Sequence, residues 1–240
     1  MQIITLIAYL TIFVILLSFI WIFLIIQTFK VNKIARRFLL SMAIYFLLMT
    51  LANLMQIFYY LEKINIGKTG IEGKIGIYNS PISIIFGAFA PFYFIFQIEK
   101  HFFPKWTIFS KHHLISIILV ILISLIFGYF IYFQIRDPNF LFEEFEMRSL
   151  WFIIYPAWAL VVLFIISTFL VFGIKTTNKY RFYSFMIFIG WTTNQLANIY
   201  IQLTDYNLLT ELVILIIFSL KYTGTILTAL GFYRLYNLKR

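Results

Sequence analysis

RFYSFMIFIGWTTNQLANIYIQ, residues 181–202, is long and apolar enough to cross a bilayer as one helix, yet one side of it is polar. Its amide and indole positions recur at i, i+3, i+4, i+7 and i+11, so they form a single stripe: Trp191, Asn194, Gln195, Asn198 and Gln202. Hydrocarbon offers an amide no hydrogen-bond partner. We therefore expect this stripe to face other protein or a wet cavity, and the other helices to be arranged to meet it.

The composition of the whole chain is typical of a membrane protein. Of its 240 residues, 62% are hydrophobic and 12% are charged, whereas a soluble chain carries about 25% charged residues. The formal net charge of +10 does not indicate nucleic-acid binding, because the basic residues lie between apolar stretches. There is no cysteine, which excludes disulfides and cysteine-ligated metals. The first apolar stretch lacks a signal-peptide cleavage site, so we expect it to remain as a helix.

A helix that crosses a membrane needs about 20 apolar residues, and seven stretches of the sequence meet this requirement. They lie at 3–29, 38–61, 81–98, 114–134, 150–173, 182–203 and 208–236. The sequence therefore predicts an all-α, polytopic membrane protein in which residues 1–240 form a single seven-helix transmembrane domain. The loop at 62–80 is rich in glycine and lysine and is expected to be flexible.

The loops between these stretches alternate in charge. The first, third and fifth loops and the C-terminal tail hold 13 of the 19 basic residues and one acid, Glu99. The even loops hold five basic residues and eight acids. Because basic loops stay on the cytoplasmic side, this bias predicts an N-out, C-in protein of the cell membrane. The basic inner loops are also expected to contact anionic lipid.

Two parts of the sequence resemble each other at an offset of 145 residues. The matching pairs are Lys30 with Lys175, Arg36 with Arg181, and Asn53 with Asn198. The first three helices would then correspond to the last three, with the fourth as a linker: a 3+1+3 arrangement of parallel repeats. SWEET transporters have parallel repeats of this kind. Their PQ-type motif is missing here, so this likeness is one of architecture alone.

Lys221 is the one charge that belongs to neither a loop nor the tail, and it lies in the middle of the last predicted span. A lysine at mid-depth costs about 2.5–3.5 kcal/mol on insertion scales and marks a functional position by default. If the last outer turn is centred near residues 205–206, Lys221 lies level with Trp191 and points toward the amide stripe, where a cation–π contact can form. The competing interpretation is a structural lysine bonded to amides and carbonyls.

A lysine in the last helix of an N-out, seven-helix bundle resembles the Schiff-base lysine of retinal proteins. The stretch from Trp151 to Trp158 is similar to an aromatic stretch of microbial rhodopsins. The aspartate expected four residues before the lysine is Ile217 here, and the third predicted helix has no carboxylate. Because these missing counter-ions would leave a cationic Schiff base unpaired, we set retinal binding below the other interpretations.

The amides of the second and sixth predicted helices form the other candidate site. Gln56 lies about one turn from Asn53 on the same face, and the repeat would bring Asn53 and Asn198 together. Amide groups suit a neutral polar solute, because they donate and accept hydrogen bonds without needing charge balance. The competing interpretation is bonding between helices, where such bonds average about 0.6 kcal/mol.

The sequence contains no enzyme signature. The three histidines, His101, His112 and His113, fall in a predicted loop, and the one acid within a predicted span, Glu211, lies at the outer end of the last one. We therefore expect no catalytic residue, cofactor or metal. The predicted function is binding or transport of a small, neutral polar solute inside the membrane. The alternatives are a seven-helix receptor or sensor with a separate cytoplasmic partner, and a scaffold subunit. The predicted ligand-binding residues are Asn53, Gln56, Trp191, Asn194, Asn198 and Lys221.

Overall fold

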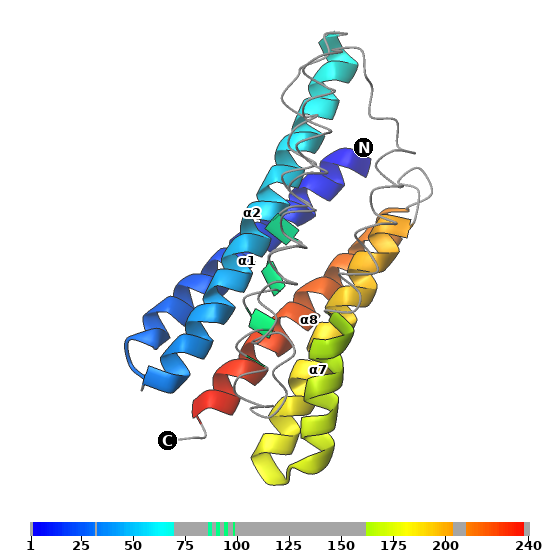
Figure 1. Ribbon diagram of the computed structural model, residues 1–240. Coiled ribbons are helices and arrows are strands. Elements are labelled where there is room, and N and C mark those ends of the chain that lie inside the picture. The colour runs from blue at the N-terminus through cyan, green and yellow to red at the C-terminus, as the bar shows by residue number, and fades with distance from the viewer. Residues whose placement is uncertain are drawn as a thin grey trace, which may run out of the picture. The chain divides into compact units, whose positions relative to one another are not determined.

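The computed structural model describes residues 2–31, 33–69, 162–203 and 210–237, and seven positions between 86 and 98. This described part of the chain is all-helical (Figure 1). Its helices are α1 (Gln2–Thr28), α2 (Lys33–Thr69), the helix Val162–Lys175, α7 (Asn178–Leu203) and α8 (Glu211–Asn237).

Three helices in the described part are long and apolar enough to cross a membrane: Ile4–Thr28, Arg36–Phe58 and Glu211–Leu235. They coincide with the first, second and last of the predicted spans. The fold is thus that of an all-α, membrane-type protein. With 26 residues, α7 is also long enough to cross a membrane. Its amides and its basic first turns make it less apolar than these three helices. The helix Val162–Lys175 is apolar and shorter.

Several predictions fall on other parts of the chain. The span predicted at 114–134, the beginning of the one at 150–173 and the three histidines lie outside the described residues. In the span predicted at 81–98, the described positions are all helical, and they include Pro91.

α2 continues further than the sequence predicts. We expected a helix at 38–61 followed by a flexible loop, whereas α2 runs from Lys33 to Thr69 and contains Gly67. The added turns contain Glu62 and Lys63, which favour helix, and one interior glycine costs only about 1 kcal/mol. The prediction that a flexible loop begins at residue 62 is therefore wrong.

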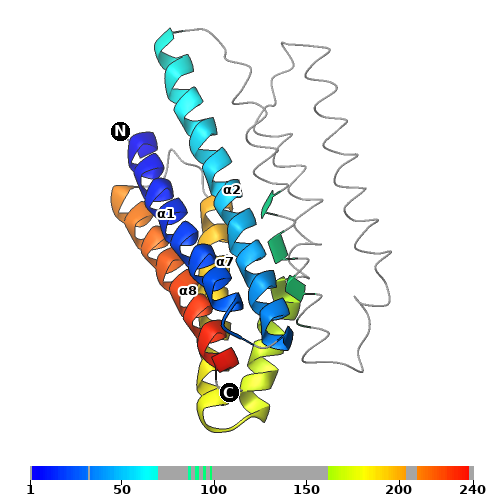
Figure 2. The ribbon, with the colours of Figure 1, turned by 90° about the vertical axis from the view of Figure 1, so that its left-hand side faces the viewer.

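The chain divides into two compact units. The first consists of Met1–Ala43 and Leu163–Arg240, and the second of Ile44–Val162. In the first unit, α7 packs antiparallel to α8 and α1 runs parallel to α8 (Figure 2). In the second unit, the Tyr45 ring of α2 contacts Phe94, with ring centres 6.1 Å apart.

The backbones of α7 and α8 approach each other closely. A Cβ atom added at Gly190 would lie 2.6 Å from the Gly224 carbonyl oxygen, and one added at Gly224 would lie 2.6 Å from the Gly190 carbonyl oxygen. A Cβ atom at Gly231 would lie 2.7 Å from Ile187 Cγ1. In lipid, helices associate through such close packing, because hydrocarbon provides no hydrophobic force between them. The glycines therefore fix how α7 sits on α8.

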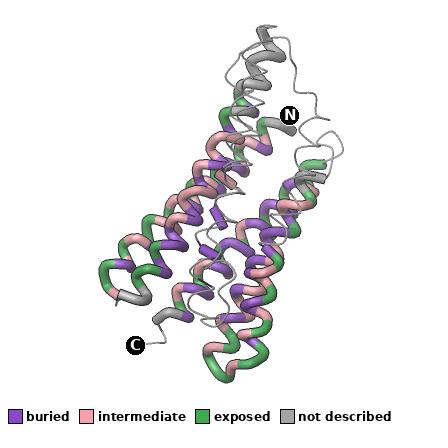
Figure 3. Tube along the Cα trace, in the orientation of Figure 1, coloured by how far each residue is buried: buried purple, intermediate pink, exposed green. Residues whose placement is uncertain are grey.

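The core of the first unit is aromatic. Phe38, Phe169 and Phe232 are fully buried, and the Phe232 ring centre lies 5.6 Å from that of Phe38 and 4.9 Å from that of Phe169. Figure 3 shows buried and exposed positions following one another along each helix. On α1 the exposed positions include Ile12 and Phe19, which is the pattern of a helix with one side in lipid.

Candidate functional site

The polar sides of α7 and α8 meet. Asn194 Nδ2 donates to Thr225 Oγ1 at 2.7 Å, and Thr225 Oγ1 donates to the Lys221 carbonyl oxygen at 2.8 Å. Asn198 Nδ2 donates to Asn194 Oδ1 at 3.1 Å. We call Asn194, Asn198 and Thr225 the amide–hydroxyl chain. It confirms the prediction that the polar stripe of α7 faces another part of the protein.

Two further polar atoms of α7 are buried without a hydrogen-bond partner in the described structure: Gln195 Oε1 and Thr192 Oγ1. The Gln195 side chain is only 4% exposed. The neighbouring Thr193, like Thr225 and Thr228 on α8, donates to the carbonyl oxygen four residues earlier, whereas Thr192 does not. Leaving a buried acceptor unsatisfied costs about 1–3 kcal/mol. We call Thr192 and Gln195 the unsatisfied pair.

The unsatisfied pair was only partly visible in the sequence. Gln195 stands in the predicted polar stripe but was not among the predicted ligand-binding residues, and Thr192 was missed. The spacing of three residues between them, which places both on one side of a helix, was the available signal. That the Thr192 hydroxyl makes no bond to its own helix cannot be read from spacing.

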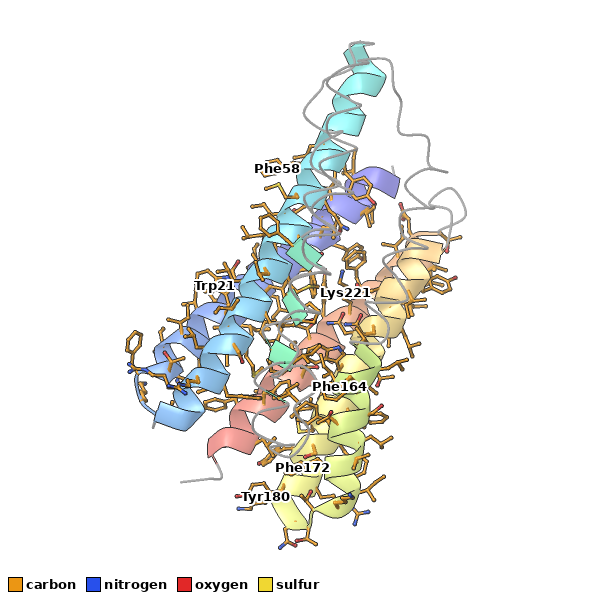
Figure 4. All side chains as sticks on the ribbon, in the orientation of Figure 1. Trp21, Phe58, Phe164, Phe172, Tyr180 and Lys221 are labelled. Carbon is orange, nitrogen blue, oxygen red and sulfur yellow. The ribbon has the colours of Figure 1, made fainter. Side chains whose placement is uncertain are left out.

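Lys221 is buried, with 5% of its surface exposed. Its side chain is labelled in Figure 4. Its ammonium lies 4.5 Å from the ring centre of Phe13 on α1 and 5.7 Å from that of Phe218. The sequence predicted a ring contact with Trp191 instead. The Trp191 ring meets Phe232 of α8, at 6.4 Å between ring centres. Lys221 thus points toward α1, and the predicted orientation toward Trp191 is wrong.

The predicted depth of Lys221 is also wrong, by about two helical turns. Asn194 contacts Thr225 across the antiparallel pair, so Lys221, one turn before Thr225, lies level with Asn198, one turn after Asn194. The prediction placed it level with Trp191 by assuming a turn centred near residues 205–206. The close contact of Gly190 with Gly224 sets a different register.

Aromatic rings pack between α1 and α8, and two of them, Phe13 and Phe218, lie near the Lys221 ammonium. Tyr9 stacks on Phe218 with ring centres 5.4 Å apart, and Phe13 stacks on Tyr222 at 5.5 Å. The Tyr222 hydroxyl also donates to the Tyr9 carbonyl oxygen at 2.6 Å. A desolvated cation over a ring face is stabilised by about 2 kcal/mol. These rings therefore offset part of the cost of burying the charge.

The two remaining predicted residues lie on α2 in the second unit. Asn53 is buried, and its Nδ2 donates to the Met49 carbonyl oxygen at 2.7 Å. Gln56 is half-buried. The pairing of Asn53 with Asn198 would join the two units and stays a prediction, as does the internal repeat.

Comparison with known proteins does not assign a function to this site. No protein-family model matches the chain, and no curated protein or solved structure matches it either. Among the described residues, no group of three or more histidine or acidic side chains is placed to hold a metal ion. The candidate site is therefore defined by the polar groups of α7 and α8.

Proposed function

We propose that this chain is a multi-pass protein of the cell membrane that binds, or carries across the membrane, a small neutral polar solute. Its seven helices would run with the N-terminus outside and the C-terminus inside. The observation that carries the proposal is the unsatisfied pair on α7, two buried oxygens with no hydrogen-bond partner in the described structure. A solute that supplies donors there would remove the cost of leaving them unpaired.

The chemistry of the buried groups supports a neutral solute. Apart from Lys221, the buried polar side chains of the described residues carry only amides and hydroxyls: Thr28, Ser41, Thr50, Asn53, Thr168, Ser184, Asn194, Gln195, Thr225 and Thr228. Gln195 Oε1 accepts hydrogen bonds and cannot donate, so its partner needs an O–H or N–H group. A polyol or a small amide meets this requirement, whereas a carboxylate does not.

Each residue has a role in this proposal. Gln195 and Thr192 accept hydrogen bonds from the solute, and the amide–hydroxyl chain holds α7 and α8 in place beside it. Trp191 lies one turn before Gln195 on the same side of α7 and supplies an apolar wall. Lys221 remains a proposed contact at the edge of the site, whereas Asn53 and Gln56, which lie in the second unit, remain predictions from the sequence. The proposal includes no catalytic residue and no cofactor.

The experiment is a thermal-shift screen of the purified protein in lipid nanodiscs against neutral polyols, sugars and small amides. We expect at least one of them to raise the unfolding temperature of the wild type. The shift should disappear in Gln195→Met and in Thr192→Val, which keep the shape and remove the oxygen. The matched control is Thr193→Val, which removes the hydroxyl that already bonds to its own helix.

Two outcomes would overturn the proposal: no neutral solute stabilises the wild type, or both test variants respond as the wild type does. Uptake of the solute into liposomes then separates the two forms of the proposal. Uptake indicates transport, and binding without uptake favours the receptor.

A further inference from the structure

One end of the first unit carries a cluster of exposed basic side chains. Because α1 runs parallel to α8 and α7 antiparallel to it, the end of α1, the beginning of α7 and the end of α8 lie at the same end of the unit (Figures 1 and 2). The cluster, which we call the basic end, consists of Lys30, Arg36, Arg37, Lys175, Lys179, Arg181 and Arg234. Glu211 is the one acid among the described residues of this unit, and it lies in the opposite, first turn of α8.

Two arginines of the basic end lie over phenyl rings. The Arg36 guanidinium carbon is 5.5 Å from the ring centre of Phe29, and that of Arg181 is 5.9 Å from the ring centre of Phe185. A guanidinium stacked on a ring keeps the N–H donors along its edge available, and these donors match the geometry of a phosphate. The two arginines lie in the first turns of different helices, Arg36 in α2 just after the α1–α2 turn and Arg181 in α7 just after the turn at residues 176–177.

Exposed apolar side chains border both turns. Phe29 is 72% exposed beside Arg36, and Ile174 and Phe182, 62% and 63% exposed, flank the turn that precedes Arg181. Aromatic side chains are enriched at the level of lipid headgroups, where one part is apolar and the other wet. Basic groups next to exposed rings fit a membrane surface better than a soluble acidic protein. Acidic side chains would pair with the basic groups but would leave the rings in water.

We propose that the basic end is a binding surface for anionic phospholipids, with one phosphate headgroup held at each of the two turns. Arg36, Arg37 and Lys30 would hold the first headgroup, and Lys175, Lys179 and Arg181 the second. The rings of Phe29 and Phe182 would then enter the boundary between headgroups and acyl chains. This surface is separate from the unsatisfied pair on α7 and does not depend on the proposed function.

The experiment measures binding of phosphatidylglycerol to the full-length, detergent-solubilised protein by native mass spectrometry, with phosphatidylcholine as the neutral lipid. Each basic residue near an anionic surface contributes about fivefold in affinity. The double variants Arg36→Gln/Arg37→Gln and Lys179→Gln/Arg181→Gln should therefore each weaken binding of one lipid by about 25-fold. Thermal unfolding in phosphatidylcholine should leave both variants like the wild type, since the changed side chains are exposed.

The matched control is Lys63→Gln/Lys68→Gln, which removes the same charge in the last turns of α2 and should leave binding unchanged. An equal loss in this control would overturn the proposal, because any positive charge would then suffice. Equal binding of the two lipids by the wild type would overturn it as well. So would binding of a polyglutamate peptide without phosphatidylglycerol, which would assign the surface to an acidic protein. If a double variant does not fold, added salt must weaken the wild type's phosphatidylglycerol binding; salt-independent binding contradicts the proposal.

Discussion

In the first unit, α8 contacts α7 and α1 through different kinds of side chain. Toward α7 it presents glycines and threonines, so the two backbones come together and a side-chain hydrogen bond from Asn194 to Thr225 forms between them. Toward α1 it presents large rings, so the helices are held by stacking, with the Lys221 ammonium among the rings. Lipid provides no hydrophobic force between helices. Both contacts must therefore be specific, and each is sensitive to a different kind of substitution.

The glycine contact should be the most sensitive position of the unit. Gly190→Val places a Cβ atom against the backbone of α8, which cannot move aside as a flexible side chain can. Overpacking typically costs 1–3 kcal/mol, and against backbone we expect a loss of about 3 kcal/mol or more in the free energy of unfolding. The measurement is denaturant unfolding in detergent followed by circular dichroism.

The control for this substitution is Gly87→Ala, a helical glycine with nothing within 4 Å of an added Cβ atom. It should stabilise the protein by about 0.5–1 kcal/mol, the ordinary gain from replacing glycine in a helix. A Gly190→Val variant as stable as the wild type would show that α7 and α8 do not touch in this register.

The aromatic contact should be less sensitive, because rings can adjust. Phe13→Leu removes the stack on Tyr222 and the ring face under Lys221, and we expect a loss of about 1–2 kcal/mol. Lys221→Met should leave the protein folded, because it removes a buried charge. In a double-mutant cycle, the combined variant should lose about 0.5–2 kcal/mol less than the sum of the two single changes. Additive losses would mean that Lys221 and Phe13 do not interact.

The hydrogen bond from Asn194 to Thr225 should have the smallest effect. Such bonds between membrane helices average about 0.6 kcal/mol and reach about 1.7 kcal/mol at most. Thr225→Val should lower the free energy of unfolding by an amount in this range. A loss as large as that of Gly190→Val would show that hydrogen bonding, and not close packing, joins α7 to α8.

The same contrast explains what could be predicted from the sequence. Periodicity and composition were sufficient to predict the helices α1, α7 and α8, the polar side of α7, and that this side faces other protein. The register of α7 on α8 could not be predicted, because it depends on where Gly190 meets Gly224 in space. That error moved Lys221 by about two turns and led to the wrong ring partner. The end of α2 was not predicted, because the glycines of residues 62–80 indicated a loop. Glu62 and Lys63 at the start of that stretch favour a helix instead.

We propose that two polar positions of α7 differ in role: Asn194 bonds α7 to α8, whereas the unsatisfied pair binds a solute. The free energies of unfolding of Asn194→Leu and Gln195→Met, measured without added solute, test this most directly. Asn194→Leu should be less stable than the wild type by about 0.6–1.7 kcal/mol. Gln195→Met should be as stable as the wild type or more stable, by up to about 1–3 kcal/mol, because it removes a buried acceptor that has no partner. If Gln195→Met is destabilised as much as Asn194→Leu, the Gln195 amide has a structural bond and the claim is wrong.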